Sequence, residues 1–170
     1  MAKGFRGARG VVKVDTKIWA QLRKRLPEKS VVKVGVLAAQ GGNATVAGSN
    51  ITMIELAAIH EFGSPKNGIP QRSFIRSTFE RPEIAAALQR MGAKFAKAIV
   101  EDKMTGAQAL GLIGAWGVAQ IKKTIKDRQT TGPDAQENKP ETIARKGSSL
   151  PLVDTGRLIN AITWLVQMGK

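Results

Sequence analysis

The stretch Val31-Val32-Lys33-Val34-Gly35-Val36-Leu37 decides the fold of this chain. β-Branched residues are enriched in strands because they pack well on a pleated surface. The alternation places three valines on one face and Lys33 with Gly35 on the other. We therefore predict a strand here whose valine face lies against a core.

One helix is expected before this strand. Asp15 can cap its start, and Pro27 ends it. Its apolar positions recur at helical spacing and are Ile18, Trp19, Leu22 and Leu26. Further upstream, residues 11–14 could add a short strand, and residues 1–10 alternate basic residues with glycines. We expect residues 1–10 to be a mobile basic arm.

A second helix is expected after a stretch of small, turn-forming residues from 38 to 50, which indicates a loop or a weak hairpin. Asn50 is placed to cap this helix, and Gly63 with Pro65 stops it. Its apolar positions are Ile51, Ile54, Ala57 or Ala58, and Phe62. This register predicts a buried Phe62, whose replacement by Ala would destabilise the domain by about 3 to 5 kcal/mol.

Two longer helices follow, and we expect them to form an antiparallel hairpin. Pro82 suits the first turn of the first helix, whose apolar stripe comprises Ile84, Leu88, Met91, Phe95 and Ile99. The second runs from about Thr105 to Arg128, with apolar positions at Leu110, Ile113, Trp116 or Gly117, Ile121 and Ile125. Glycines at positions 111, 114 and 117 lower its helix propensity by roughly 1 kcal/mol each and predict that another backbone approaches closely there.

The last part of the chain combines a long loop with a short helix and a strand. Residues 129–151 lack periodicity and predict the loop. Asp154 or Thr155 can cap a helical turn through Leu158, and apolar residues alternate with polar ones from 162 to 168. The sum is an α+β class: a single domain over residues 11–170, with a small, mainly antiparallel sheet of three or four strands packed with several helices.

Composition excludes several classes of function. The 170 residues contain no cysteine and a single histidine, which excludes disulfides, thiolate nucleophiles and multi-histidine metal sites. No apolar run is long enough to cross a bilayer, and no apolar stretch follows the basic N-terminus as in a secretory signal. We therefore expect no cofactor, no membrane partner and retention in the compartment of synthesis.

Two short motifs allow an enzymatic interpretation. Leu152-Val153-Asp154-Thr155-Gly156 matches the Asp-Thr-Gly of retropepsin-like aspartic proteases, but those proteases are almost wholly β and carry a small residue where this chain has Arg157. His60 next to Glu61 could form a proton relay, although a histidine making a local hydrogen bond at a helix end explains the pair as well. We expect helix capping at the first motif and no enzymatic activity.

The net charge of +14 favours contact with nucleic acid or another acidic surface. Basic residues gather in three places: Lys3, Arg6 and Arg9; Arg23, Lys24 and Arg25; and Lys122 and Lys123. No helix-turn-helix or zinc finger connects them, so any DNA contact would be non-specific. The three tryptophans, Trp19, Trp116 and Trp164, occupy apolar registers and are expected in the core rather than under stacked bases.

Four motifs in series carry a family resemblance. They are Ala57-Ala58-Ile59-His60-Glu61-Phe62-Gly63, Ile69-Pro70-Gln71-Arg72-Ser73-Phe74-Ile75-Arg76, Pro140-Glu141-Thr142-Ile143-Ala144-Arg145-Lys146, and Pro151-Leu152-Val153-Asp154-Thr155-Gly156-Arg157-Leu158 followed by Ala161-Ile162-Thr163. Together they resemble the neck and tail-completion proteins of tailed bacteriophages, over residues 31 to 168. Gln71, Ser73 and Asn160 depart from the residues that are more usual in that family.

The resemblance implies a structural virion protein at the head–tail junction, without catalytic activity. Copies would form a ring, expected to be hexameric, between a head connector and a tail tube or tail terminator, around packaged double-stranded DNA. It would be made in the host cytoplasm. Structural roles carry over to Glu61, Phe62, Gly63, Pro70, Arg72, Phe74, Asp154, Thr155, Gly156 and Leu158. The alternatives are a basic nucleic-acid-binding protein and, more remotely, the aspartic protease.

Overall fold

The computed structural model describes residues 16–127, 144 and 156–169. In chain order the elements are α1 (Thr16–Arg25), β1 (Val31–Val36), η1 (Ala38–Gln40), α2 (Met53–Phe62), η2 (Pro65–Asn67), α3 (Arg76–Phe79), α4 (Pro82–Val100), α5 (Gly106–Lys126), α7 (Arg157–Ala161) and β2 (Ile162–Gln167). The expected α+β class is confirmed. The arm at 1–10, the strand at 11–14 and, apart from Ala144, the loop at 129–151 lie outside the described residues.

Two strands from distant parts of the chain form the sheet. β1 and β2 pair antiparallel, from Val31 opposite Gln167 to Val36 opposite Ile162. The strand predicted at 31–37 is therefore confirmed, as is the one predicted near the end of the chain. The described residues contain two of the three or four strands that were expected.

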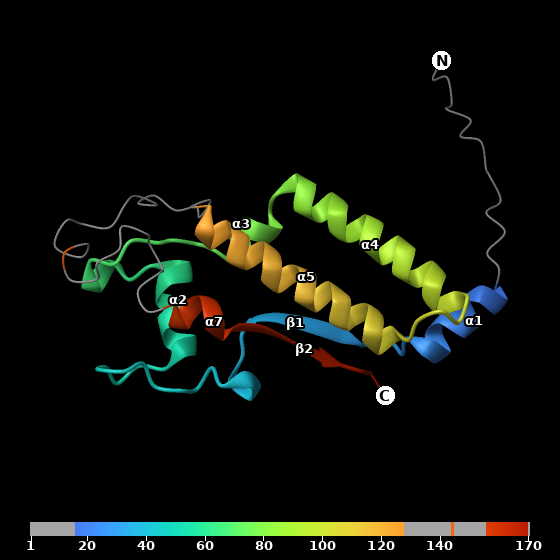
Figure 1. Ribbon diagram of the computed structural model, residues 1–170, viewed down its shortest axis with the longest axis horizontal. Helices are drawn as coiled ribbons and strands as arrows, with labels where there is room; N and C mark the ends of the chain where they lie inside the picture. The colour runs from blue at the N-terminus through green and yellow to red at the C-terminus, as the bar shows by residue number, and fades with distance from the viewer. Residues whose placement is uncertain (1–15, 128–143, 145–155, 170) are drawn as a thin grey trace, which may run out of the picture.

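Helix α5 lies between the sheet and α4, to which it runs antiparallel as predicted (Figure 1). Its glycines let it lie close to the sheet. A Cβ on Gly114 would come within 2.8 Å of Val32 Cγ2 and 2.9 Å of Trp164 Cβ. A close approach is thus present at these glycines, but the neighbouring atoms belong to side chains and not, as was predicted, to another backbone.

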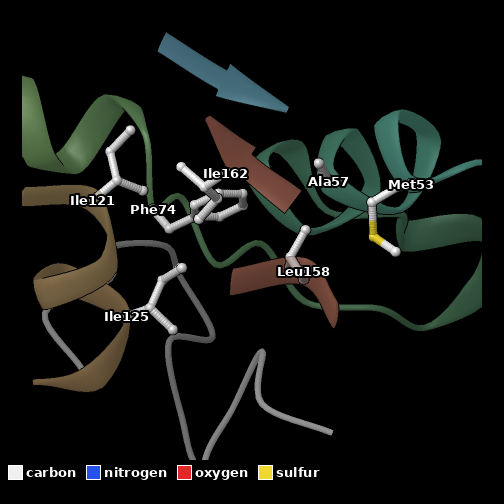
Figure 2. Close-up of a cluster of buried hydrophobic side chains, with 7 residues drawn as sticks. All are labelled: Met53, Ala57, Phe74, Ile121, Ile125, Leu158 and Ile162. Carbon is white, nitrogen blue, oxygen red and sulfur yellow. The ribbon is translucent and has the colours of Figure 1, made fainter. Parts of the chain in front are cut away.

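The core lies where α2, α5, α7 and the segment before α3 meet (Figure 2). Phe74, fully buried, is its largest side chain. The cluster around it comprises Met53, Ala57, Ile121, Ile125, Leu158 and Ile162. On α4 the predicted apolar stripe is buried at its ends, Ile84 and Ile99, while Leu88 between them is 36% exposed.

The start and the inner face of α2 differ from the prediction. Thr52, not Asn50, is the N-cap: Thr52 Oγ1 accepts a hydrogen bond from the Glu55 N–H at 3.2 Å, and Glu55 Oε2 accepts one from the Thr52 N–H at 2.7 Å. The buried positions are Met53, Ala57 and Glu61. Because successive residues turn by 100° around a helix, this register points Phe62 outward. The predicted burial of Phe62 is wrong: the residue is 68% exposed.

No helix within the described ranges has the length and apolar character that a bilayer crossing requires.

Candidate functional site

The Glu61 carboxylate connects the end of α2 to the segment that leads into α3. Its Oε1 accepts hydrogen bonds from Ser73 Oγ at 2.7 Å and from the Arg76 N–H at 3.0 Å. Its Oε2 accepts from the N–H groups of Phe74 and Ile75 at 2.8 and 2.9 Å. A carboxylate from another helix therefore satisfies backbone donors that the short α3 leaves without an intrahelical partner.

These hydrogen bonds keep Glu61 ionised. Burial raises the pKa of a carboxyl, but the N–H groups of Ile75 and Arg76, the Ser73 hydroxyl and the Phe74 N–H together outweigh it and lower the pKa of Glu61 below its ordinary value of 4.5. With all of these donors directed at it, the carboxylate acts as a structural acceptor. The proton relay considered for His60 and Glu61 has no support in this arrangement.

Backbone contacts join the same two segments. The Arg72 N–H donates to the His60 carbonyl at 2.8 Å, and Gln71 Nε2 donates to the Glu61 carbonyl at 3.1 Å. Gly63, at φ +75°, allows the chain to double back, because a Cβ there would lie 2.9 Å from the Gln71 nitrogen. We call the set of Glu61, Gly63, Arg72, Ser73 and Phe74 the Glu61 junction.

Of the other family-motif positions, Pro70 lies beside this junction and Leu158 lies in the core cluster of Phe74. Pro70 is half-buried and follows the Ser64–Ile69 bridge that closes the turn around η2. Arg72 is 8% exposed. The N-cap of α7 is Gly156, at φ +72°, and not Asp154 or Thr155 as predicted, so no side chain caps this helix. Asp154 and Thr155 lie outside the described residues, whereas Phe62 points away from the junction.

The basic residues do not form one surface in the described part of the chain. Arg25 donates to the Ile99 carbonyl at 2.6 Å and pairs with Asp102 at 3.1 Å, so it fastens α1 to the end of α4. Arg23 pairs with Glu28, and Lys24 is exposed. Lys122 and Lys123 lie near the last turn of α5, at the opposite end of the molecule from α1 (Figure 1). Lys3, Arg6 and Arg9 are outside the described residues.

A groove between α1 and α4 is a feature that the sequence analysis missed. It has a volume of about 430 Å³ and is lined by Ile18, Trp19, Leu22, Ala96, Lys97, Val100 and Glu101. Trp19, expected in the core, is 54% exposed, and Trp164 is 37% exposed. The helical period of α1 correctly marked its apolar face but could not tell whether another element covers that face.

A buried hydroxyl pair was also missed. Thr78 Oγ1 donates to Thr124 Oγ1 at 2.7 Å, and Arg81 Nη2 also donates to that Thr124 oxygen. The pair links α3 to α5 and is fully buried. No sequence pattern marks Thr78 or Thr124 as a pair, because each has its partner on another helix.

The described residues contain no group of three histidine or acidic side chains that could hold a metal ion. The Glu61 junction holds the end of α2 to the segment before α3.

Comparison with known proteins gives no relative: the chain matches no family model, no curated protein and no solved structure.

Proposed function

We propose that this chain is a structural virion protein of a tailed phage, acting at the head–tail junction as a neck, tail-completion or tail-terminator component. It would join the head connector to the tail and surround the DNA channel as a ring of identical copies. It would have no catalytic role.

One observation carries this proposal: motif positions far apart in the sequence meet at one place. Glu61 binds the backbone from Phe74 to Arg76, and Phe74 packs in the same cluster as Leu158. A shared structural unit gives a reason for their order and for the residue types that they contain.

Charge and composition agree with this role. A net charge of +14 suits a protein that lies beside packaged DNA and acidic neighbours. The same charge makes free copies repel each other, so we expect the ring to form on its docking partner rather than in dilute solution.

The experiment is electron microscopy of lysates from a phage that encodes this chain, with the gene interrupted. Filled heads beside separate, finished tails are the expected result, and a plasmid-borne copy should restore joined particles. Intact infectious particles from the interrupted phage would overturn the proposal.

The alternative of a basic nucleic-acid-binding protein makes a different prediction. Salt-sensitive DNA binding by a chain that never enters the virion would favour it. The aspartic protease is the remote alternative, and pepstatin-sensitive cleavage would support it. The abundance of helix in the described residues speaks against it, because that fold is almost wholly β.

A further inference from the structure

The outer face of α2 presents an uncovered aromatic side chain. Glu55, Ala58 and Phe62 are the exposed residues of this helix. Their spacing of three and four places them on one side of it. Phe62 is 68% exposed, the highest value among the large apolar residues exposed in the described chain. Ala58 beside it leaves room for another surface to approach.

The groove between α1 and α4 has the complementary shape. Ile18, Trp19, Leu22, Ala96 and Val100 give it apolar walls in a volume of about 430 Å³. Trp19 and Ile18 on its rim are 54% and 46% exposed. An aromatic side chain in such a groove would remove apolar surface of both partners from water.

The charges of the two surfaces are opposite in sign. Glu55 is the charged residue on the exposed face of α2, because Glu61 is buried on the inner face, although the chain as a whole has a net charge of +14. Helix α1 carries four basic residues and no acidic one. Glu55, whose pKa is lowered by its hydrogen bonds to the Thr52 N–H and hydroxyl, stays ionised on the exposed face of α2. The groove lining contains both Lys97 and Glu101, and on α1 the side chains of Arg23 and Arg25 pair with Glu28 and Asp102. Glu55 of another copy would therefore meet the basic residues of α1 beside the groove, and the electrostatic attraction to them favours that occupant.

The two surfaces lie at opposite ends of the long axis of the molecule, α2 at one end and α1 at the other (Figure 1). A contact between them therefore joins unlike patches on successive copies. Such a heterologous contact builds a ring when the rotation closes and a filament when it does not.

We propose that Phe62 of one copy inserts into the α1–α4 groove of the next copy, with Glu55 against the basic residues of α1. The inference deepens the proposed function and rests on it for the ring. It is a helix-in-groove contact in which one aromatic residue is the anchor. A single such contact between chains of high like charge is weak, so it forms at high protein concentration or on a docking partner.

The test uses the full chain, which has no cysteine of its own. Ala58→Cys places a thiol beside Phe62, and Ala96→Cys places one in the groove, and both substitutions leave Phe62 and Trp19 in place. The two variants are mixed at high concentration and treated with a short bismaleimide, and the products are separated by denaturing electrophoresis. We expect dimers that contain one chain of each kind, and a ladder beyond dimer from a chain that carries both cysteines.

Adding Phe62→Ala to the cysteine variants should reduce the cross-linked yield about tenfold or more, as expected for the loss of a buried aromatic anchor. Adding Leu112→Ala is the matched control, because Leu112 is a 49% exposed apolar residue on α5, outside both surfaces. The control should leave the yield unchanged. An equal yield with and without Phe62, no cross-link between copies, or cross-links only between identical positions would overturn the inference.

The outcome separates the inference from the proposed function. If cross-links fail while the chain is found at the head–tail junction of virions, this contact is wrong and the function stands. If cross-links form as expected while virions lack the chain, the contact stands and the proposed function falls. If the groove thiol is protected only by a different virion protein, the occupant is that protein and the inference is overturned.

Discussion

Glu61 and Phe62 are adjacent in the sequence, yet Glu61 is 6% exposed and Phe62 is 68% exposed. Hydrophobicity alone would place them the other way round. The carboxylate can be buried because hydrogen-bond donors from residues 73–76 replace the water it loses. At the residue scale, the hydrogen bonds available to the Glu61 carboxylate decide which side of α2 faces inward.

Glu61→Gln tests this account. The amide keeps one acceptor oxygen and loses the charge, and hydrogen bonds to charged groups contribute about 1.5–3 kcal/mol each. We expect the free energy of unfolding to fall by about 2–3 kcal/mol, measured by chemical denaturation at neutral pH. Glu83→Gln, at an exposed side chain of α4, is the control and should have little effect.

We also expect the stability difference between the wild type and Glu61→Gln to depend on pH. The folded-state pKa of Glu61 is lowered from 4.5, so its contribution to stability is fully present above pH 4.5 and is lost as pH falls through the lowered folded-state pKa. The difference in the free energy of unfolding between the wild type and Glu61→Gln should therefore become smaller as the pH falls. Chemical denaturation of both proteins at pH values from 7 to about 3 measures this difference. A difference that stays constant over this range would contradict the charged hydrogen-bond network.

Phe74 and Phe62 give a further prediction. Phe74→Ala should destabilise the domain by about 3–5 kcal/mol because its ring fills the centre of the core. Phe62→Ala should change the free energy of unfolding by less than about 0.5 kcal/mol, as at most surface positions. Thermal melting at low protein concentration, where copies do not associate, compares the two. A large loss of stability in Phe62→Ala would show that the phenyl side chain of Phe62 is covered within one chain.

At the scale of elements, the sequence predicted what depends on local pattern. The β-branched alternation at 31–36, Pro82 at the first turn of α4 and the start of α5 at about Thr105 all lie where they were expected. The start of α2 was two residues too early, because Thr52 and Glu55 form a capping box after Asn50. The link from Glu61 to residues 73–76 could not be predicted, because no periodicity reports a contact between a helix end and a turn.

Glycines in α4 and α5 provide a prediction at this scale. Gly114→Ala gains roughly 1 kcal/mol of helix propensity, but its Cβ would overlap Val32 and Trp164. We expect a net loss of about 1–3 kcal/mol, as in other overpacked cores. Gly92→Ala in α4 meets no atom within 4 Å and should stabilise the protein by about 0.5–1 kcal/mol. Denaturant unfolding of both variants measures the difference, and equal gains would show that α5 does not lie close to the sheet.

At the scale of the whole molecule, the charge of +14 acts on two kinds of contact in opposite directions. Raising salt from about 50 to 200 mM should weaken binding to a DNA duplex, because the release of condensed counterions gains less free energy when the bulk salt concentration is higher. The same change should strengthen self-association, because salt screens the repulsion between copies. Fluorescence anisotropy measures DNA binding, and sedimentation velocity measures self-association. Self-association that falls with salt would mean that the attraction between Glu55 and the basic residues of the next copy outweighs the repulsion between the net charges.

The pairing of Val36 with Ile162 brings together two strands that flank nearly all of the helices. Closing so long a loop costs chain entropy before any ladder hydrogen bond forms. Helices α4 and α5 are neighbours in the chain and can pack together early in folding. The sheet forms later, because its two strands are far apart in the sequence. Substitutions at the β1–β2 ladder should therefore act mainly on the rate of unfolding, whereas the rate of folding should respond to the α4–α5 hairpin.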